Sequence, residues 1–213
     1  ASELGEWADV FHAFAGALGN GDTRDEVFAT LLAQAIEGQA DAGGLLAYNY
    51  LAGEPITGLE EGRPLFVRTP DSAFNLANFM RAQVYGAFGT LSLGMRILDA
   101  EGVGVDALLA HGGLFRTAGV AQRLLAAAVG APVAVGATAS EGGAWGIAVL
   151  AAYSTAVRTQ PDLTLAAYLN ETVFASAETV VVEPDPDDMI GYARFLEAYE
   201  TGLAIERAAI TAL

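Results

Sequence analysis

The sequence contains no cysteine and has few cations, only two histidines and no long uninterrupted apolar run. The absence of cysteine excludes disulfides, thiolate metal sites and a cysteine nucleophile. Only 10 of the 213 residues are Lys or Arg, against 26 Asp or Glu, and the formal net charge is −16. Because nucleic acids and anionic membranes attract basic surfaces, this charge argues against both as partners.

Two further absences bear on location and chemistry. The longest weakly polar stretch, residues 124–139, is interrupted by glycine and proline, so no membrane span is expected. The first ten residues lack the basic start and apolar run of a signal peptide. With His12 and His111 as the only histidines, the spacing supports no Ser-His-Asp arrangement. We therefore expect a soluble, cytoplasmic protein.

The composition is that of a globular chain, with 53% hydrophobic and 17% charged residues. The length is sufficient for a sizeable core, and no internal repeat or low-complexity linker divides the chain. We therefore predict a single domain over residues 1–213. Hydrophobic spacing and capping residues predict helices at residues 6–18, 72–98, 118–130, 145–150, 161–169 and 187–209, and a helix to residue 37 that Asp22 or Thr23 caps. Strands are predicted at residues 45–51, 65–67, 106–110, 133–135 and 179–182. The spacing also predicts one apolar face in the first helix and a buried face in the helix at 72–98, made respectively by Trp7, Val10, Phe11, Phe14 and Leu18 and by Leu76, Phe79, Met80, Val84 and Ile97.

Residues 105–153 are the most informative stretch of the chain. They read as strand, Gly-Gly turn, helix, strand, Gly-Gly turn and helix. Apolar strands that alternate with helices predict an α/β fold with a parallel or mixed sheet covered by helices. In such sheets a ligand binds beyond the carboxyl end of a strand, where a turn opens a helix. Gly112 and Gly113 are therefore the first candidate site, although a Gly-Gly pair also occurs as a plain turn.

Three blocks of the sequence together resemble a known family. The strand that ends in Gly112-Gly113 precedes a helix containing Gln122, and a Gly-Ala-x-Gly-x-Ala run follows at residues 143–148. Residues 44–54 carry a Tyr-Leu-x-Gly-Glu segment, and residues 76–88 form a helix with a central Arg-Ala pair. In order and spacing the three blocks resemble the C-terminal half of the FGGY family of carbohydrate kinases, which phosphorylate sugars and polyols with ATP.

The resemblance implies a fold and an activity. FGGY kinases have two actin-like ATPase domains of the ribonuclease H type, with ATP and sugar in the cleft between them. Residues 1–213 then correspond to one such domain, the C-terminal nucleotide-binding lobe, with the N-terminal lobe absent. The family's general-base aspartate lies in that other lobe. No catalytic residue is therefore expected in this chain, and the lobe alone should be inactive, because phosphoryl transfer depends on positioning.

The resemblance also implies a cofactor site. It places the adenosine of ATP at the Gly-Gly turn and the start of the next helix, at residues Gly112, Gly113, Leu114, Arg116 and Thr117. Mg²⁺ is expected only through the nucleotide, with no metal site on the protein. The implied substrate is a pentulose such as xylulose or ribulose. The expected partners are the sugar, ATP and the N-terminal lobe, and a homodimer stays open.

Two departures from the family keep other functions open. Leu114, Phe115 and Arg116 follow the Gly-Gly pair, where the family often has a small residue, and residues 69–72 replace a His-rich turn. One alternative is another actin-like ATPase, acetate-kinase-like or chaperone-like, which would hydrolyse ATP without sugar. The second is a non-catalytic binding or oligomerisation module that has kept the kinase fold.

The remaining motifs have structural interpretations beside functional ones. Residues 102–107 fit a Gly-x-Gly-x-x-Ala dinucleotide pattern, but they lead into a strand instead of opening a helix. The acidic residues at 183–188 could bind a cation, but a helix cap is favoured. His111 and Arg116 could touch a ligand or be structural, and His12 falls where the resemblance places a wall of the nucleotide site. Trp145 is expected in the core.

Overall fold

The computed structural model describes residues 2–117, 119–136, 142–175 and 178–213. The helices are α1 (Ser2–Ala17), α2 (Arg24–Ile36), α3 (Leu76–Ala100), α4 (Val120–Val129), α5 (Gly142–Ala156), α6 (Leu165–Tyr168) and α7 (Pro186–Ala212). The strands are β1 (Leu46–Tyr48), β2 (Leu65–Val67), β3 (Leu108–Ala110), β4 (Val133–Gly136) and β5 (Thr179–Val182). No described helix is both long and apolar enough to cross a membrane.

Most predicted elements form where the sequence indicates. The bounds of β2 and β5 agree with the prediction, and Gly130 ends α4 in a left-handed conformation. Two helix starts were predicted too early: α3 begins after Asn75 and α6 after Thr164, because the side chains of these residues accept backbone N–H groups as N-caps. The predicted helix start at residue 118 lies outside the described residues.

Helix α3 is the centre of the core and contacts α2, α4, α7 and β1. Phe79, Met80 and Val84 on α3 are buried as predicted, whereas Leu76 and Ile97 near its ends are exposed, contrary to the prediction. The reason is geometric: the neighbours of α3 cover its middle turns, and its ends extend past them. In α1 the expected apolar face is buried only in part. Leu4 and Ala8 are buried and Trp7 and Phe11 partly so, whereas Val10, Phe14 and Leu18 are exposed, contrary to the prediction.

Tyrosines connect α3, α7 and β1 through the core. The Tyr48 hydroxyl donates to the carbonyl oxygen of Tyr199 at 2.9 Å, and the Tyr199 hydroxyl donates to the Tyr50 hydroxyl at 2.8 Å. The Tyr50 hydroxyl in turn lies 2.8 Å from Oγ1 of Thr90 on α3. Because buried polar groups must be paired, these bonds allow bulky tyrosines to fill the core and fix the relative positions of three elements.

The strands form two small sheets. β1 and β2 pair antiparallel, while β3 pairs parallel with β4, and β4 pairs antiparallel with β5, so the second sheet is mixed as predicted. α4 covers one face of this sheet, where Nε2 of Gln122 donates to the carbonyl oxygens of Val133 and Val180, both at 2.7 Å. The other face is open: Leu109 is 77% exposed and Val181 is 52% exposed.

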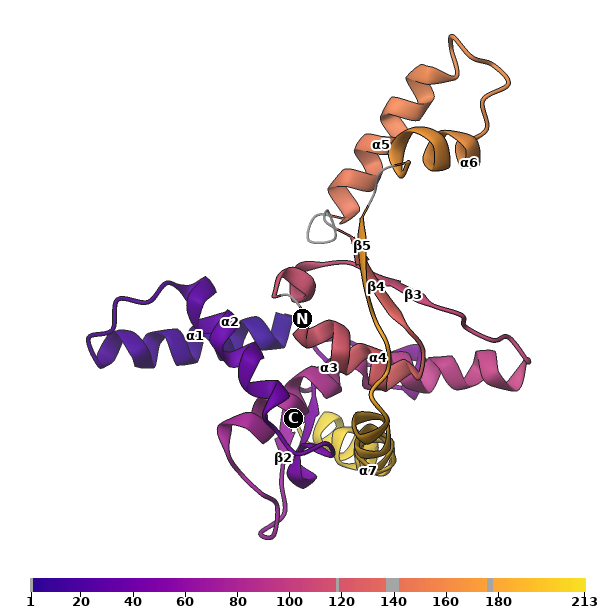
Figure 1. Cartoon of the computed structure of the whole chain (residues 1–213). Helices are drawn as coiled ribbons and strands as arrows, with labels where there is room; N and C mark the ends of the chain where they lie inside the picture. Colours follow the sequence, from indigo (N-terminus) through magenta and orange to yellow (C-terminus); the bar gives the residue numbers. More distant parts are fainter. Residues whose placement is uncertain (1, 118, 137–141, 176–177) are drawn as a thin grey trace.

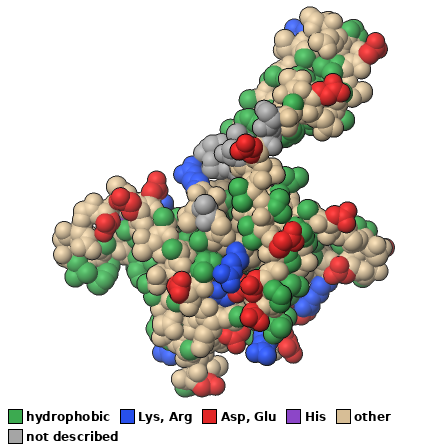
Figure 2. Space-filling model, viewed as in Figure 1, with side chains coloured by type: hydrophobic (Ala, Val, Ile, Leu, Met, Phe, Trp, Pro, Cys, Tyr) green, Lys and Arg blue, Asp and Glu red, His purple; other side chains and the backbone are tan. Residues whose placement is uncertain are grey.

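Helices α5 and α6 project from the body beyond the end of the β3–β4–β5 sheet (Figure 1). No described residue of α5 is buried, although the helix is apolar on all sides. Trp145 was expected in the core, but it packs instead against Phe174, with ring centroids 5.5 Å apart. Hydrophobic side chains are visible over this projection in Figure 2. The prediction failed because a uniformly apolar sequence indicates burial but not which partner provides it.

Candidate functional site

The turn after β3 has a backbone that glycine makes possible. Gly112 adopts φ 118° and ψ 170°, a region that residues with a side chain rarely enter. The chain then forms a short 3₁₀-helix, η3 (Gly113–Arg116), whose amide of Phe115 donates to the carbonyl oxygen of Gly112 at 3.0 Å. The first glycine of the pair therefore sets the direction of the turn, and the residues after it face the first two helices.

A cleft with a volume of about 640 Å³ lies between this turn and the helices α1 and α2. Four of the five residues predicted for the cofactor site line it: Gly113, Leu114, Arg116 and Thr117. Gly112 shapes the turn but is not among the lining residues. The remaining lining residues come from α1 and the first two turns of α2, namely Gly5, Glu6, Arg24, Asp25, Phe28 and Ala29.

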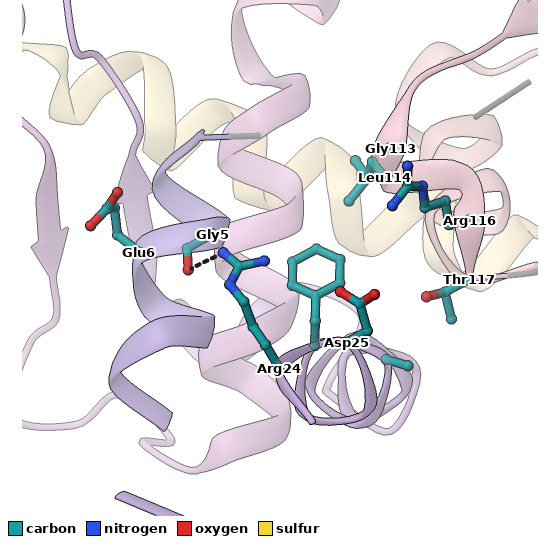
Figure 3. Close-up of a pocket in the computed structure, with 10 residues that line it drawn as sticks. Gly5, Glu6, Arg24, Asp25, Gly113, Leu114, Arg116 and Thr117 are labelled. Atoms are coloured by element: carbon teal, nitrogen blue, oxygen red, sulfur yellow. Dashed lines mark hydrogen bonds between the residues drawn. The ribbon is translucent and has the colours of Figure 1, made fainter. Parts of the chain in front are cut away.

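The start of α2 is held by a capping box. The Thr23 side chain accepts the amide of Glu26 at 3.3 Å, and the Glu26 carboxylate accepts the amide of Thr23 at 2.7 Å. This cap fixes the first turn of α2, which carries Arg24 and Asp25 (Figure 3). The wall that faces the Gly112 turn is therefore a rigid helix end.

Arg24 also joins α2 to α1. Its guanidinium donates to the carboxylate of Asp9, and one of its Nη atoms donates to the carbonyl oxygen of Gly5 at 3.2 Å. The hydrogen bond from Arg24 is the main reason that the pKa of Asp9 lies below its usual value. Both side chains are about half exposed, so the pair contributes little to stability, but it fixes the position of the α1 backbone beside the cleft.

The cleft has carboxylates on its helical side and a cation on the opposite side. Asp25 on α2 and Arg116 on the turn lie across the cleft from each other, while the Glu6 side chain extends away from the turn (Figure 3). Phe28, Ala29 and Leu114 add apolar surface. Apolar walls with a few polar groups of both signs suit a flat, largely neutral group with hydrogen-bonding edges.

The other sequence candidates lie elsewhere. The ring Nε2 of His12 is 3.1 Å from the carbonyl oxygen of Asp22, so His12 supports the α1–α2 turn. His111 packs against the start of α5, since a Cβ at Gly142 would stand 2.8 Å from its Nδ1. Neither histidine is among the residues that line the cleft, so the placement of His12 in the nucleotide-site wall is not supported.

The acidic segment and the dinucleotide pattern have structural roles. Asp185 is the N-cap of α7, where its carboxylate accepts the amides of Asp187 and Asp188, both at 3.0 Å. The hydrogen bond from the Asp188 amide contributes most to lowering the pKa of Asp185. Residues 102–107 lead into β3 and open no helix, so they are not a dinucleotide fingerprint. Among the described residues no group of three or more His, Asp or Glu could hold a metal ion.

Sequence reasoning missed the half of the cleft that α1 and α2 contribute. The capping box at Thr23 and Glu26 identifies the start of a helix, but no local signal says which distant turn that helix end faces. Arg24, Asp25 and Phe28 therefore entered the site only through the three-dimensional structure.

The mixed β3–β4–β5 sheet with α4 on one face, and the cleft at the turn after β3, agree with an α/β domain of the actin-like, ribonuclease H-like class. Residues 1–155 match the C-terminal domain of the FGGY family of carbohydrate kinases. The chain belongs to this family, whose C-terminal domain has that fold. No curated protein sequence matches the chain.

Solved structures with the same fold include sugar kinases. The xylulose kinase from Rhodospirillum rubrum is similar with a TM-score of 0.66, and the ligand-bound xylulose kinase from Lactobacillus acidophilus with 0.69. The gluconate kinase from Lactobacillus acidophilus has a TM-score of 0.67. Each alignment covers 96% of this chain at 20% identity. The chain spans only 38% of the length of each of these proteins.

Proposed function

We propose that this chain is a single domain that serves as the nucleotide-binding lobe of an ATP-dependent sugar kinase. The adenosine of ATP occupies the cleft between the Gly112 turn and α2. One observation carries the proposal: four residues predicted for the cofactor site meet the first turns of α2 around one cleft. Its volume of about 640 Å³ lies within the usual range of small-molecule sites.

The residues in the cleft fit a nucleoside. A Cβ placed on Gly113 would have no heavy atom within 4 Å, so a flat base can approach the backbone there. Phe28 and Leu114 provide apolar contact surface for the base, and Asp25 provides an acceptor for a hydroxyl or amino group. When bound, the nucleotide supplies the phosphoryl group and brings Mg²⁺ with it.

The charges also orient the nucleotide. The chain contains no lysine, and Arg24 is already paired with Asp9, so the helical side of the cleft offers phosphates little attraction. Arg116 is the cation on the turn side. We infer that the phosphates lie on the Arg116 side of the cleft, away from Asp25. The role of these residues is then to bind and orient, and the chain alone is expected to transfer no phosphoryl group.

Family membership supports a sugar as the acceptor. Structures with the same fold are xylulose and gluconate kinases, and a pentulose such as xylulose or ribulose is the acceptor that we propose. The cytoplasm is the proposed location. Calorimetric titration of this chain with Mg-ADP tests the nucleotide site, and a parallel titration with Mg-GDP tests whether the site is specific for adenine. Heat release that saturates for Mg-ADP supports it, and none at millimolar nucleotide argues against it.

The sugar is tested on a polypeptide that also carries an N-terminal kinase lobe. ADP formation is followed with xylulose, ribulose and gluconate in separate assays. Sugar-dependent ADP formation supports the kinase function, and the preferred sugar names the substrate. Nucleotide binding without turnover on any sugar favours the non-catalytic module, for which the bulky Leu114 after the Gly-Gly pair is the structural argument.

A further inference from the structure

Asp188 receives two arginines from different helices. Its Oδ1 accepts an Nη of Arg81 on α3 at 2.8 Å, and its Oδ2 accepts Nε of Arg123 on α4 at 2.7 Å. The Asp188 side chain is 4% exposed and that of Arg81 is 2% exposed. A single buried carboxylate on α7 is therefore shared between a buried arginine and a partly exposed one.

Arg81 connects this carboxylate to the end of α2. Its Nε donates to the carbonyl oxygen of Ala35 at 2.8 Å, and its second Nη donates to the carbonyl oxygen of Ile36 at 3.0 Å. These carbonyls belong to the last turn of α2, where no intrahelical partner is available. The N-terminal end of α2 lines the cleft. Arg81 therefore anchors the C-terminal end of a helix whose other end forms one wall of the cleft.

Arg123 connects the same carboxylate to the other wall. It lies in the first turn of α4, directly after the segment of η3 and Thr117 that lines the cleft. Its amide donates to the carbonyl oxygen of Gly119 at 2.9 Å, so its position follows that of the α4 start. Asp188 is thus connected to the α2 wall of the cleft through Arg81, and to the start of α4, next to the other wall, through Arg123.

We propose that Asp188 is a positioning residue that sets the separation of the two cleft walls through Arg81 and Arg123. The inference rests on the proposed nucleotide site. Helices transmit displacements along their axes as rigid rods, so loss of either arginine contact shifts one wall against the other. Nucleotide affinity then depends on a carboxylate that does not line the cleft.

Arg123→Gln is the most informative variant. Asp188→Asn would leave buried Arg81 without its carboxylate and is expected to damage the fold itself. Arg123 is 40% exposed, so its replacement removes the α4 contact to Asp188, together with a 4.0 Å ion pair to Asp185, and leaves Arg81 paired. Arg96→Gln is the matched control, because Arg96 on α3 pairs with Glu200 on α7 at 2.7 Å, is 50% exposed and does not line the cleft.

The experiment measures the Kd for Mg-ADP by calorimetry and the amide NMR spectrum without nucleotide. Arg123→Gln is expected to raise Kd about 2- to 30-fold, while Arg96→Gln leaves it unchanged and Arg123→Lys, which keeps the cation, retains more affinity. Equal Kd values for the wild type and Arg123→Gln overturn the proposal. If the wild type binds no nucleotide, the proposed function fails in this chain and the amide shifts decide. Shifts at both residues 113–117 and residues 35–37 support the link between the walls, and shifts confined to α4 overturn it.

Discussion

The hydroxyl of Tyr48 donates a hydrogen bond to the carbonyl oxygen of Tyr199 at 2.9 Å, although β1 and α7 are distant in the sequence. The two rings also stack, with centroids 4.7 Å apart. This contact joins a strand near the start of the chain to its last helix, across the surface of α3. Together with the hydrogen bond from Tyr199 to Tyr50, this pair holds β1 and α7 against each other.

Replacing Tyr48 by Phe keeps the stacking and removes the hydroxyl. The carbonyl of Tyr199 stays in the hydrogen-bond ladder of α7 but loses its second donor, and loss of one such hydrogen bond costs about 0.5–1.5 kcal/mol. Urea unfolding monitored by circular dichroism measures the loss. Tyr168→Phe, on the projecting α6, is the control and should change the free energy of unfolding by much less. Equal changes in the free energy of unfolding for the two variants would show that the hydrogen bond from Tyr48 does not stabilise the protein.

Gly89→Ala is expected to destabilise the protein because α3 and α7 approach closely there. A Cβ at Gly89 would stand 2.7 Å from Cε1 of Tyr199, and overpacking of a core costs about 1–3 kcal/mol. Gly94→Ala in the same helix is the control. Its Cβ would meet only Cδ1 of Ile56 at 3.8 Å, so the gain in helix propensity, about 1 kcal/mol, should dominate. Thermal unfolding of both variants should give changes of opposite sign.

Glu206 predicts a pH dependence of stability. Its side chain is buried, and burial raises its pKa, while one carboxylate oxygen accepts the amide of Arg63 at 2.6 Å. A raised pKa in the folded state means that the contribution to stability is complete below the unfolded pKa and is lost as pH rises through the folded pKa. Glu206→Gln keeps the acceptor for Arg63 and removes this loss. The free energy of unfolding of the variant relative to the wild type should rise between pH 4 and pH 8, and a constant difference would contradict this.

Gly112→Ala tests the turn that supports the cleft. At φ 118° an alanine is strained by about 1–3 kcal/mol, and relief of that strain displaces η3. We expect lower stability together with weaker binding of Mg-ADP. Gly104→Ala, at the other end of β3, is the control, since a Cβ there has open space and no positive φ is involved. A Gly112→Ala variant that binds Mg-ADP as the wild type does would separate the turn from the site.

The sequence predicted those helix ends and strands that depend only on a few neighbouring residues. A helix cap at Asp22 or Thr23, a helix end at Gly130 and a strand at residues 179–182 were each predicted from a few neighbouring residues, and the structure has the cap at Thr23, the end at Gly130 and the strand. The exposed Ile97 and the projecting Trp145 were mispredicted, because their burial depends on what lies opposite them. The resemblance located the Gly112 side of the cleft, but the contribution of Arg24 and Asp25 depends on how α2 packs against α3, which no short motif encodes.

Amide NMR during titration with Mg-ADP tests whether adenosine binds between the Gly112 turn and α2. We predict saturable shifts at Gly113, Leu114 and Thr117 and, at the same nucleotide concentrations, at Arg24 and Asp25. Shifts that saturate elsewhere, with these amides unchanged, would contradict the assignment of the site.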